Sequence, residues 1–258
     1  MIFDLKREVA LVTGAGPNTG RGIIMALSKA GAAVAVSDLN PEHADAGRDS
    51  ILNADGHAIS VPFDVTDFDA VRAGVSNARD QLGPITILVN NAGTIANPQP
   101  GFTGGQLGPF EGSDPWMWRR WIDINLYGAM QCIHSTLPDM TARGRGRIIQ
   151  ISSTSGSRGL AGGSVYGASK AGIEGFLRGL AMEVAPRGVT VNTLALGTME
   201  MIDKVDNERT RAGLRQVPLG RRGRGREVGA AAVWLASDAG EWITGQTIHL
   251  NGGTFQGR

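Results

Sequence analysis

The chain has 258 residues, of which 41% are hydrophobic and 19% charged, and its formal net charge at pH 7 is +1. This length is enough for one large domain with a buried core, and the near-neutral charge disfavours broad attraction to nucleic acid or to an anionic membrane. A single cysteine, Cys132, no apolar run of about 18 residues and no signal peptide together predict a cytoplasmic protein without disulfides.

Short β-branched runs alternate with helical segments along the chain. Residues 9–12, 33–37, 58–61, 85–89, 147–151, 189–194 and 247–250 are typical of buried strands. Residues 20–30, 41–54, 67–82, 115–141, 164–185 and 226–237 are typical of helices, and Ser113-Asp114-Pro115 is a favourable helix start. This sustained alternation predicts an α/β fold, in which one domain has a doubly wound parallel sheet of about seven strands with helices on both faces.

Two segments are longer than ordinary connections. Residues 94–113 contain five glycines and three prolines, and residues 198–218 follow a predicted strand. Long segments at the carboxyl ends of strands are where such sheets place substrate lids. We therefore predict one catalytic domain over 1–258, with substrate loops at 94–118 and 198–218.

The first predicted strand runs into a glycine-rich turn between Gly14 and Gly20, where a helix begins. Backbone N–H groups at a helix start suit a pyrophosphate, although glycine also simply ends strands. The next strand ends at Asp38, whose carboxylate could accept hydrogen bonds from a ribose diol; the alternative is a solvated loop acid. Because a carboxylate repels a 2′-phosphate, NAD is expected rather than NADP. Arg21, on the opening helical turn, does not change this expectation.

Tyr166 and Lys170 lie four positions apart, on one face of a predicted helix, with Ser153 thirteen residues upstream of the tyrosine. A tyrosine beside an ammonium group can exchange a proton near neutral pH, because a charge at about 4 Å lowers its pKa by about three units at an effective dielectric of about 20. The spacing alone is weak evidence, since most such pairs lie on the surface.

Several motifs together resemble the short-chain dehydrogenase/reductase family over nearly the whole chain. Residues 13–20 read Thr-Gly-Ala-Gly-Pro-Asn-Thr-Gly, residues 90–93 read Asn-Asn-Ala-Gly, and Asp64-Val65 resembles the family's adenine-contacting pair. Asn125, Ser153, Tyr166 and Lys170 are similar in order and spacing to its active-site residues. The tail resembles the family at residues 218–221, 234–238, 243–246 and 251–253.

The resemblance implies a Rossmann-type fold and hydride transfer between a nicotinamide and a carbinol or carbonyl carbon. Tyr166 would be the general acid and base, and Lys170 would bind the nicotinamide ribose and lower the tyrosine pKa. Ser153 would orient the carbonyl oxygen, and Asn125 would hold a relay water. Cofactor contacts are expected from Thr13, Gly14, Asn18, Thr19, Gly20, Asp38, Leu39, Asp64, Val65, Asn91, Ala92, Gly93, Tyr166, Lys170, Gly197, Thr198 and Met199.

Some positions depart from the family pattern. Asn18 replaces the middle glycine of the turn, and asparagine tolerates a left-handed backbone best among the other residues. Leu196 replaces a proline, and Met201 replaces a threonine that usually contacts the carboxamide, so Thr198 is the candidate for the missing hydroxyl. The loop after Gly93 is longer than the family pattern and carries Phe102, Phe110 and, at its end, Trp116.

The remaining candidates favour structural interpretations. The arginine runs at 143–147 and 221–226 are expected to be solvated turns, and four scattered histidines (His43, His57, His134, His249) show no metal-ligand spacing. Trp116, Trp118 and Trp121 are expected to pack in the core and between subunits. The resemblance implies a homotetramer, with a homodimer as the alternative.

The predicted function is an NAD-dependent alcohol dehydrogenase or ketone reductase acting on a small or medium secondary alcohol or ketone. A 3-oxoacyl thioester reductase is the enzymatic alternative. A dinucleotide-binding regulator with little turnover is the alternative from another class, and Leu196 and Met201 keep it open.

Overall fold

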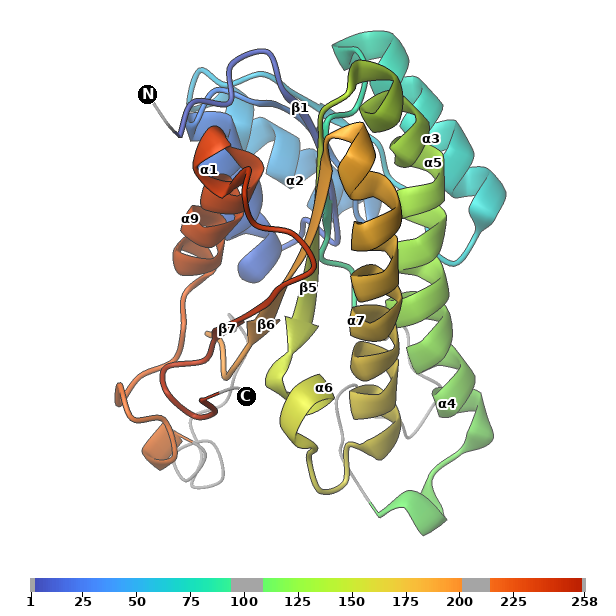
Figure 1. Cartoon of the computed structure of the whole chain (residues 1–258), viewed down its shortest axis with the longest axis vertical. Coiled ribbons are helices and arrows are strands. Elements are labelled where there is room, and N and C mark those ends of the chain that lie inside the picture. Colours follow the sequence, from blue (N-terminus) through green and yellow to red (C-terminus); the bar gives the residue numbers. More distant parts are fainter. Residues whose placement is uncertain (1–2, 94–108, 201–213, 257–258) are drawn as a thin grey trace.

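A computed structural model describes residues 3–93, 109–200 and 214–256, and it contains one seven-stranded parallel sheet between two layers of helices (Figure 1). The strand order is β3-β2-β1-β4-β5-β6-β7, with every neighbouring pair parallel. This confirms the predicted fold class. The strands are β1 (Val9–Thr13), β2 (Ala33–Val36), β3 (Ala58–Ser60), β4 (Ile87–Asn90), β5 (Gly146–Ser153), β6 (Val189–Leu196) and β7 (Thr247–Leu250).

The helices divide between the two faces of the sheet, as Figure 1 shows. One face carries α1 (Thr19–Lys29), α2 (Pro41–Leu52) and α9 (Gly225–Ala236). The other carries α3 (Phe68–Leu82), α4 (Pro115–Ile122), α5 (Ala129–Arg143) and α7 (Ser164–Val184). Shorter elements are α6 (Thr154–Arg158), η1 (Phe110–Gly112), η2 (Asp123–Gly128), η3 (Ala185–Arg187) and η4 (Asp238–Gly240).

The pleat of the strands divides the core into two clusters, one on each face. In β1, Val9 and Leu11 belong to the cluster under α3, α5 and α7, whereas Ala10 and Val12 belong to the cluster under α1, α2 and α9. Successive side chains of a strand point to opposite faces, so a strand buried on both sides must be apolar at every position. The uninterrupted apolar runs of the sequence therefore reflect burial on both faces.

Helices α1 and α9 approach each other through glycines. A Cβ atom added to Gly22 would collide with the backbone of Gly225, and one added to Gly229 would collide with the carbonyl of Gly22. Because neither backbone can yield, only glycine permits this separation. The contact fixes α9 against the helix that follows the glycine-rich turn.

The predicted single helix over residues 115–141 is wrong in its middle. The structure has α4, then six residues of π-helix in η2, then α5, joined end to end. Asn125 lies in η2, is fully buried, and donates its side-chain Nδ2 to the carbonyl of Trp121 at 3.1 Å. A polar side chain that bonds to the helix backbone competes with the regular ladder, and π segments are frequent at functional sites.

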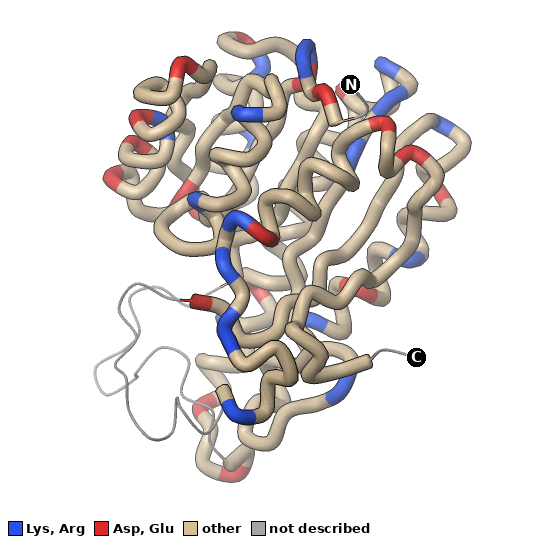
Figure 2. Tube along the Cα trace, turned by 90° about the vertical axis from the view of Figure 1, so that its left-hand side faces the viewer, with Lys and Arg blue, Asp and Glu red and all other residues tan. Residues whose placement is uncertain are grey.

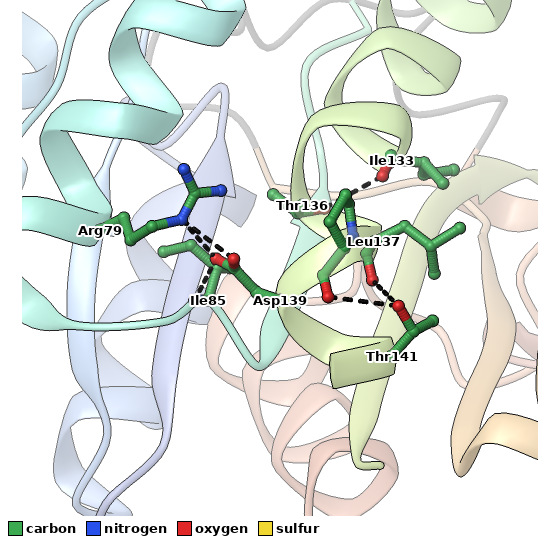
Figure 3. A network of polar contacts seen from close by, with 8 residues as sticks. Arg79, Ile85, Ile133, Thr136, Leu137, Asp139 and Thr141 are labelled. Carbon is green, nitrogen blue, oxygen red and sulfur yellow. Dashed lines mark hydrogen bonds and ion pairs between the residues drawn. The ribbon is translucent and has the colours of Figure 1, made fainter. Parts of the chain in front are cut away.

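A carboxylate on α5 ties α3 to the start of β4 (Figure 3). Arg79 Nε donates to both oxygens of Asp139 at 2.9 and 3.0 Å, and the backbone N–H of Ile85 donates to Asp139 Oδ2 at 3.0 Å. Nearby, the hydroxyls of Thr136 and Thr141 donate back to α5 carbonyls. This network lies at the amino ends of the strands and orders the edge opposite the carboxyl ends.

Charges of both signs are interspersed along the chain trace in Figure 2. In the second arginine run, Arg221 pairs with Glu227 at 2.6 Å and Arg224 with Glu200 at 3.2 Å. No helix in the described ranges is long and apolar enough to cross a membrane. Within the same ranges, no three histidine, cysteine, aspartate or glutamate side chains gather as a metal site would require.

Candidate functional site

The residues singled out in the sequence gather along the carboxyl edge of the sheet. Thr13, Asn90, Ser153 and Leu196 are the last residues of β1, β4, β5 and β6. The carboxyl ends of parallel strands meet at one edge, where open α/β sheets bind ligands. Helix α6 lies at this edge below the arrowhead of β5 in Figure 1.

The turn after β1 is locked to the turn after β4. Thr13 Oγ1 accepts hydrogen bonds from the N–H groups of Asn91 and Ala92 at 3.2 Å, and Asn91 Nδ2 donates to the carbonyl of Gly14 at 2.6 Å. Gly14 has a φ of 60°, and a Cβ there would lie 2.7 Å from Ala92 Cα. Glycine is therefore required at this position by both conformation and space.

Asn18 adopts the positive φ expected of it. Its backbone has φ 72° and ψ −118°, and it precedes Thr19, the first residue of α1. A Cβ on Gly20 would collide with the Gly14 carbonyl, so the turn folds tightly onto the helix start. A tight glycine turn at a helix N-terminus presents backbone N–H groups to an anion. The residues present fit the pyrophosphate of a dinucleotide.

Asp38 follows β2 and is held by the backbone. Its Oδ2 accepts from the N–H of Gly16 and its Oδ1 from the N–H of Asn40, both at 3.0 Å. His43 Nδ1 lies 3.5 Å from Oδ1, and the side chain of Asp38 is 15% exposed. The carboxylate is thus fixed beside the glycine-rich turn, with part of its surface open, while Leu39 is exposed next to it.

Asp64 and Val65 follow β3 and belong to a compact turn. Asp64 Oδ1 accepts from both the N–H and the hydroxyl of Thr66 at 2.8 Å. The carbonyl of Val65 accepts a hydrogen bond from Gln131 Nε2 at 3.0 Å. The side chain of Val65 packs so closely against Gly128 that a Cβ there would collide with it. The pair therefore lies against the η2–α5 junction, close to the segment that carries Asn125.

Four side chains expected to act in catalysis lie together. Gly93 shows this directly, because a Cβ added to it would lie 2.8 Å from Asn125 Oδ1 and 2.9 Å from Lys170 Nζ. Lys170 is 3% exposed and donates from Nζ to the carbonyl of Ile151 at 3.2 Å. Ser153 lowers the pKa of Tyr166, which places its hydroxyl near the phenol and completes the group.

The ring of Tyr166 packs edge-on against Trp121. Their centroids are 4.9 Å apart with an interplanar angle of 63°, and Trp121 belongs to the core. The tryptophan of α4 thus fixes the orientation of the phenol from α7. Asn125 Oδ1, buried near Lys170, has no hydrogen-bond partner within the described residues. A buried acceptor of this kind favours a bound donor such as water.

In the protein alone the pKa of Tyr166 is raised, so the lowering expected from Lys170 together with oxidised cofactor stays a prediction. Burial raises the pKa of Tyr166, and the Ser153 hydrogen bond opposes this only in part. Lys170 Nζ lies 5.8 Å from the centroid of the phenol ring. Burial lowers the pKa of Lys170 itself to about 8, against the opposing charge of Glu174. Burial therefore affects the pKa of Lys170 more than the attraction to Glu174 does.

The segment after β6 is described only at its start. Gly197 donates to the carbonyl of Leu250, and the Thr198 carbonyl accepts from Gly223, which also forms a bridge with Met199. Leu196 is buried. Met201 lies outside the described residues, as do 94–108, including Phe102, and 202–213.

The aromatic residues near the long loop pack on each other and on the core. Phe110 stacks on Trp118 with centroids 5.0 Å apart, and Trp118 Nε1 donates to Ser113 Oγ at 2.8 Å. Trp116 packs against the core cluster under α7. These contacts favour local packing for the three side chains.

Sequence reasoning missed two groups near the site. Glu174, one turn beyond Lys170 on α7, is buried and accepts from Ser152 Oγ at 2.6 Å. Ser155, in α6, donates its N–H to Ser153 Oγ and accepts from the hydroxyl, both at 3.2 Å. The four-residue spacing of Lys170 and Glu174 is visible in the sequence, whereas α6 carries no apolar periodicity that would predict it.

Comparisons with known proteins agree with this architecture over the whole chain. A family model described as enoyl-(acyl carrier protein) reductase matches residues 14–254. The 3-oxoacyl-[acyl-carrier-protein] reductase FabG of Vibrio harveyi is 37% identical over 255 residues, covering 98% of this chain and 99% of the relative. The acetoacetyl-CoA reductase of Shinella zoogloeoides is 37% identical over 254 residues, covering 96% and 98%.

Solved structures match equally well. A putative short-chain alcohol dehydrogenase from Sinorhizobium meliloti superposes with a TM-score of 0.89 at 33% identity, covering 98% of both chains. A gluconate 5-dehydrogenase from Burkholderia cenocepacia, in complex with NADP and tartrate, also has a TM-score of 0.89, at 30% identity, covering 98% of this chain and 97% of that one.

Proposed function

The chain belongs to the short-chain dehydrogenase/reductase family of oxidoreductases, and from this premise we propose that it transfers a hydride between NAD(H) and a secondary alcohol or ketone. The observation that carries this proposal is the convergence of Ser153, Tyr166, Lys170 and Asn125 beside Gly93 at the carboxyl edge of the sheet. When bound, the nicotinamide supplies or accepts the hydride.

Tyr166 is the group that moves the proton. In reduction its hydroxyl donates to the oxygen of the substrate carbonyl, and in oxidation it accepts the proton of the alcohol. Burial raises the pKa of Tyr166, so in the protein alone the phenol keeps its proton, and the charge of Lys170 favours its release during the reaction. Ser153, whose hydroxyl lies near the phenol, binds the same substrate oxygen and orients it.

Lys170 and Asn125 support the proton transfer. The ammonium group of Lys170 lies beside the phenol, binds the ribose nearest the reacting ring, and stabilises the tyrosinate that forms when the proton leaves. Asn125 Oδ1 faces the same space and has no partner among the described residues. Its role is to hold a water that returns protons to Lys170.

The remainder of the dinucleotide lies along the glycine-rich turn. Backbone N–H groups from Gly14 to Gly20 hold the pyrophosphate, and Asp38 accepts from the adenine-side ribose. Asp38 supports NAD, because a carboxylate fixed by two N–H groups cannot turn away from a 2′-phosphate. The Burkholderia gluconate dehydrogenase in complex with NADP favours the other choice, so direct measurement of both nucleotides is required.

A 3-oxoacyl thioester is the second candidate substrate. The resemblance to 3-oxoacyl-[acyl-carrier-protein] reductase and acetoacetyl-CoA reductase over nearly the whole chain favours it. Such substrates carry the same ketone that Tyr166 and Ser153 would bind, so the chemistry does not distinguish them. The proposed substrate loops at 94–118 and 198–218 would make the distinction.

A panel assay tests the proposed function. The protein is incubated with NAD and secondary alcohols, or with NADH and ketones that include a 3-oxoacyl thioester, and absorbance of the reduced nucleotide is followed. Turnover on any member supports the proposal. Nucleotide binding without turnover on every member favours the dinucleotide-binding regulator.

The protein is also proposed to act as a homotetramer. Large apolar side chains are exposed in η2, on α7 and before β7: Tyr127, Met182 and Trp242, of which Trp242 is 97% exposed. Exposed apolar surface at separate places favours contacts with further copies. Light scattering after size exclusion distinguishes a tetramer from a dimer.

A further inference from the structure

Glu174 is a buried carboxylate to which the mechanism above gives no task. It is 5% exposed, and Ser152 Oγ donates to its Oε1 at 2.6 Å. A Cβ added to Gly156 would lie 3.1 Å from the same oxygen, so the backbone of α6 closes over the carboxylate. Burying a carboxylate is costly unless hydrogen bonds and an opposite charge compensate, and one hydroxyl is little compensation.

Lys170 is the nearby opposite charge, and it acts through space, because its Nζ donates to the carbonyl of Ile151 rather than to Glu174. The two residues lie four apart on α7, which makes them neighbours on one face, and Lys170 is 3% exposed. The groups packed around its Nζ are Tyr166 from α7, the neutral amide of Asn125 from η2 and the carbonyl of Ile151 from β5. Within the described part of the chain, Glu174 is the carboxylate that acts on this ammonium group.

We propose that Glu174 is a positioning residue that keeps the ammonium group of Lys170 charged and in place beside Tyr166, with Ser152 fixing the carboxylate. The inference deepens the proposed function and rests on it. Ile151, Ser152 and Ser153 are consecutive in β5: the first binds Lys170 through its carbonyl and the second binds Glu174 through its hydroxyl. These two hydrogen bonds join β5 to α7 on either side of the proposed charge pair.

The test is a pH titration of the Lys170 amino group by NMR, in protein labelled with ¹³C at lysine Cε. The chain has four lysines, Lys6, Lys29, Lys170 and Lys204, so its spectrum is simple and Lys170→Arg assigns the signal. Glu174→Gln removes the charge but keeps the shape and an acceptor for Ser152. Glu183→Gln removes an exposed carboxylate from the same helix and is the matched control.

The expected result is a lower titration midpoint for Lys170 in Glu174→Gln. The attraction between opposite charges about 5 to 6 Å apart, at an effective dielectric of about 20, shifts the midpoint by about two pH units. Motion of the two side chains reduces the expected shift to about one unit. Glu183→Gln should move the midpoint by less than about 0.3 unit, since solvent screens an exposed charge. A folded Glu174→Gln protein with an unmoved Lys170 midpoint overturns the inference.

Activity gives a second measurement that a purely structural role would not change. The alkaline limb of the kcat profile should move to lower pH in Glu174→Gln with little change in KM, and Glu174→Asp should restore part of the shift. If Glu174→Gln does not fold, the pH titration of the wild-type protein is the test. The Lys170 signal should show a second inflection as Glu174 protonates, and the absence of that inflection overturns the inference. Wild-type protein without turnover contradicts the proposed function but leaves the titration interpretable.

Discussion

Replacing Asp38 by asparagine tests the cofactor choice. The side chain is held by the N–H groups of Gly16 and Asn40 and is 15% exposed, so its charge is fixed where the adenine-side ribose is proposed to bind. Asparagine keeps the size and one acceptor oxygen but removes the charge. Hydrogen bonds to a charged acceptor contribute about 1.5 to 3 kcal/mol, so the variant should bind NAD about tenfold or more weakly.

The same substitution should strengthen the binding of NADP. A carboxylate about 5 Å from a phosphate of charge about −1.5 to −2 is repelled by about 1 to 7 kcal/mol for effective dielectrics from about 80 to about 20. In a partly open site the repulsion lies near the lower end of this range, so removing it should strengthen NADP binding about tenfold. The ratio of NAD to NADP affinity should therefore fall by about 100-fold.

The assay is a titration of each nucleotide by isothermal calorimetry, with Asp49→Asn as the control. Asp49 lies on α2, pairs with Arg48 and is 55% exposed. Its replacement by asparagine therefore removes the same charge at a position away from the proposed ribose site. A wild type that already prefers NADP, or an Asp38→Asn protein with an unchanged ratio, would refute the reasoning.

Three further predictions concern the scaffold. In urea denaturation, Gly22→Ala should lower the free energy of unfolding by about 1 to 3 kcal/mol, because the added Cβ forces α1 away from α9. The control is Gly179→Ala, whose added Cβ has no atom within 4 Å, and its free energy of unfolding should be unchanged or slightly higher. Asp139→Asn should lower the free energy of unfolding by about 1 to 2 kcal/mol, because the partly exposed Arg79 loses its charged partner. An unchanged urea midpoint would contradict this. Burial raises the pKa of Cys132 to about 12, so Ellman's reagent at about pH 8 should label it only after unfolding, and rapid labelling of native protein would contradict its position.

The sequence predicted the sheet well because its strands are buried on both faces. Each of the seven predicted strands overlaps an observed one, and 247–250 matches β7 at both ends. Strand ends were less accurate: β5 continues to Ser153 through two serines that apolar patterning does not include, and β6 continues through Ala195 to Leu196. Tertiary pairing, not local propensity, sets those limits.

Other features depend on tertiary contacts and had no local signal. The π-helical turn at Asn125 has the same apolar spacing as the α-helix that was predicted. The direction of the Tyr166 pKa shift follows from burial under Trp121 and neighbouring elements, which the four-residue spacing to Lys170 does not report. Motif positions could thus be predicted from sequence, whereas their electrostatics required the packed structure.

The kinetics of Tyr166→Phe test the central claim most directly. Phenylalanine keeps the ring that packs on Trp121 and removes only the phenol hydroxyl. Measured with NADH and the best ketone of the panel, kcat should fall by at least about 100-fold while the affinity for NADH is retained. Turnover equal to that of the wild type would contradict the assignment of Tyr166 as the proton donor.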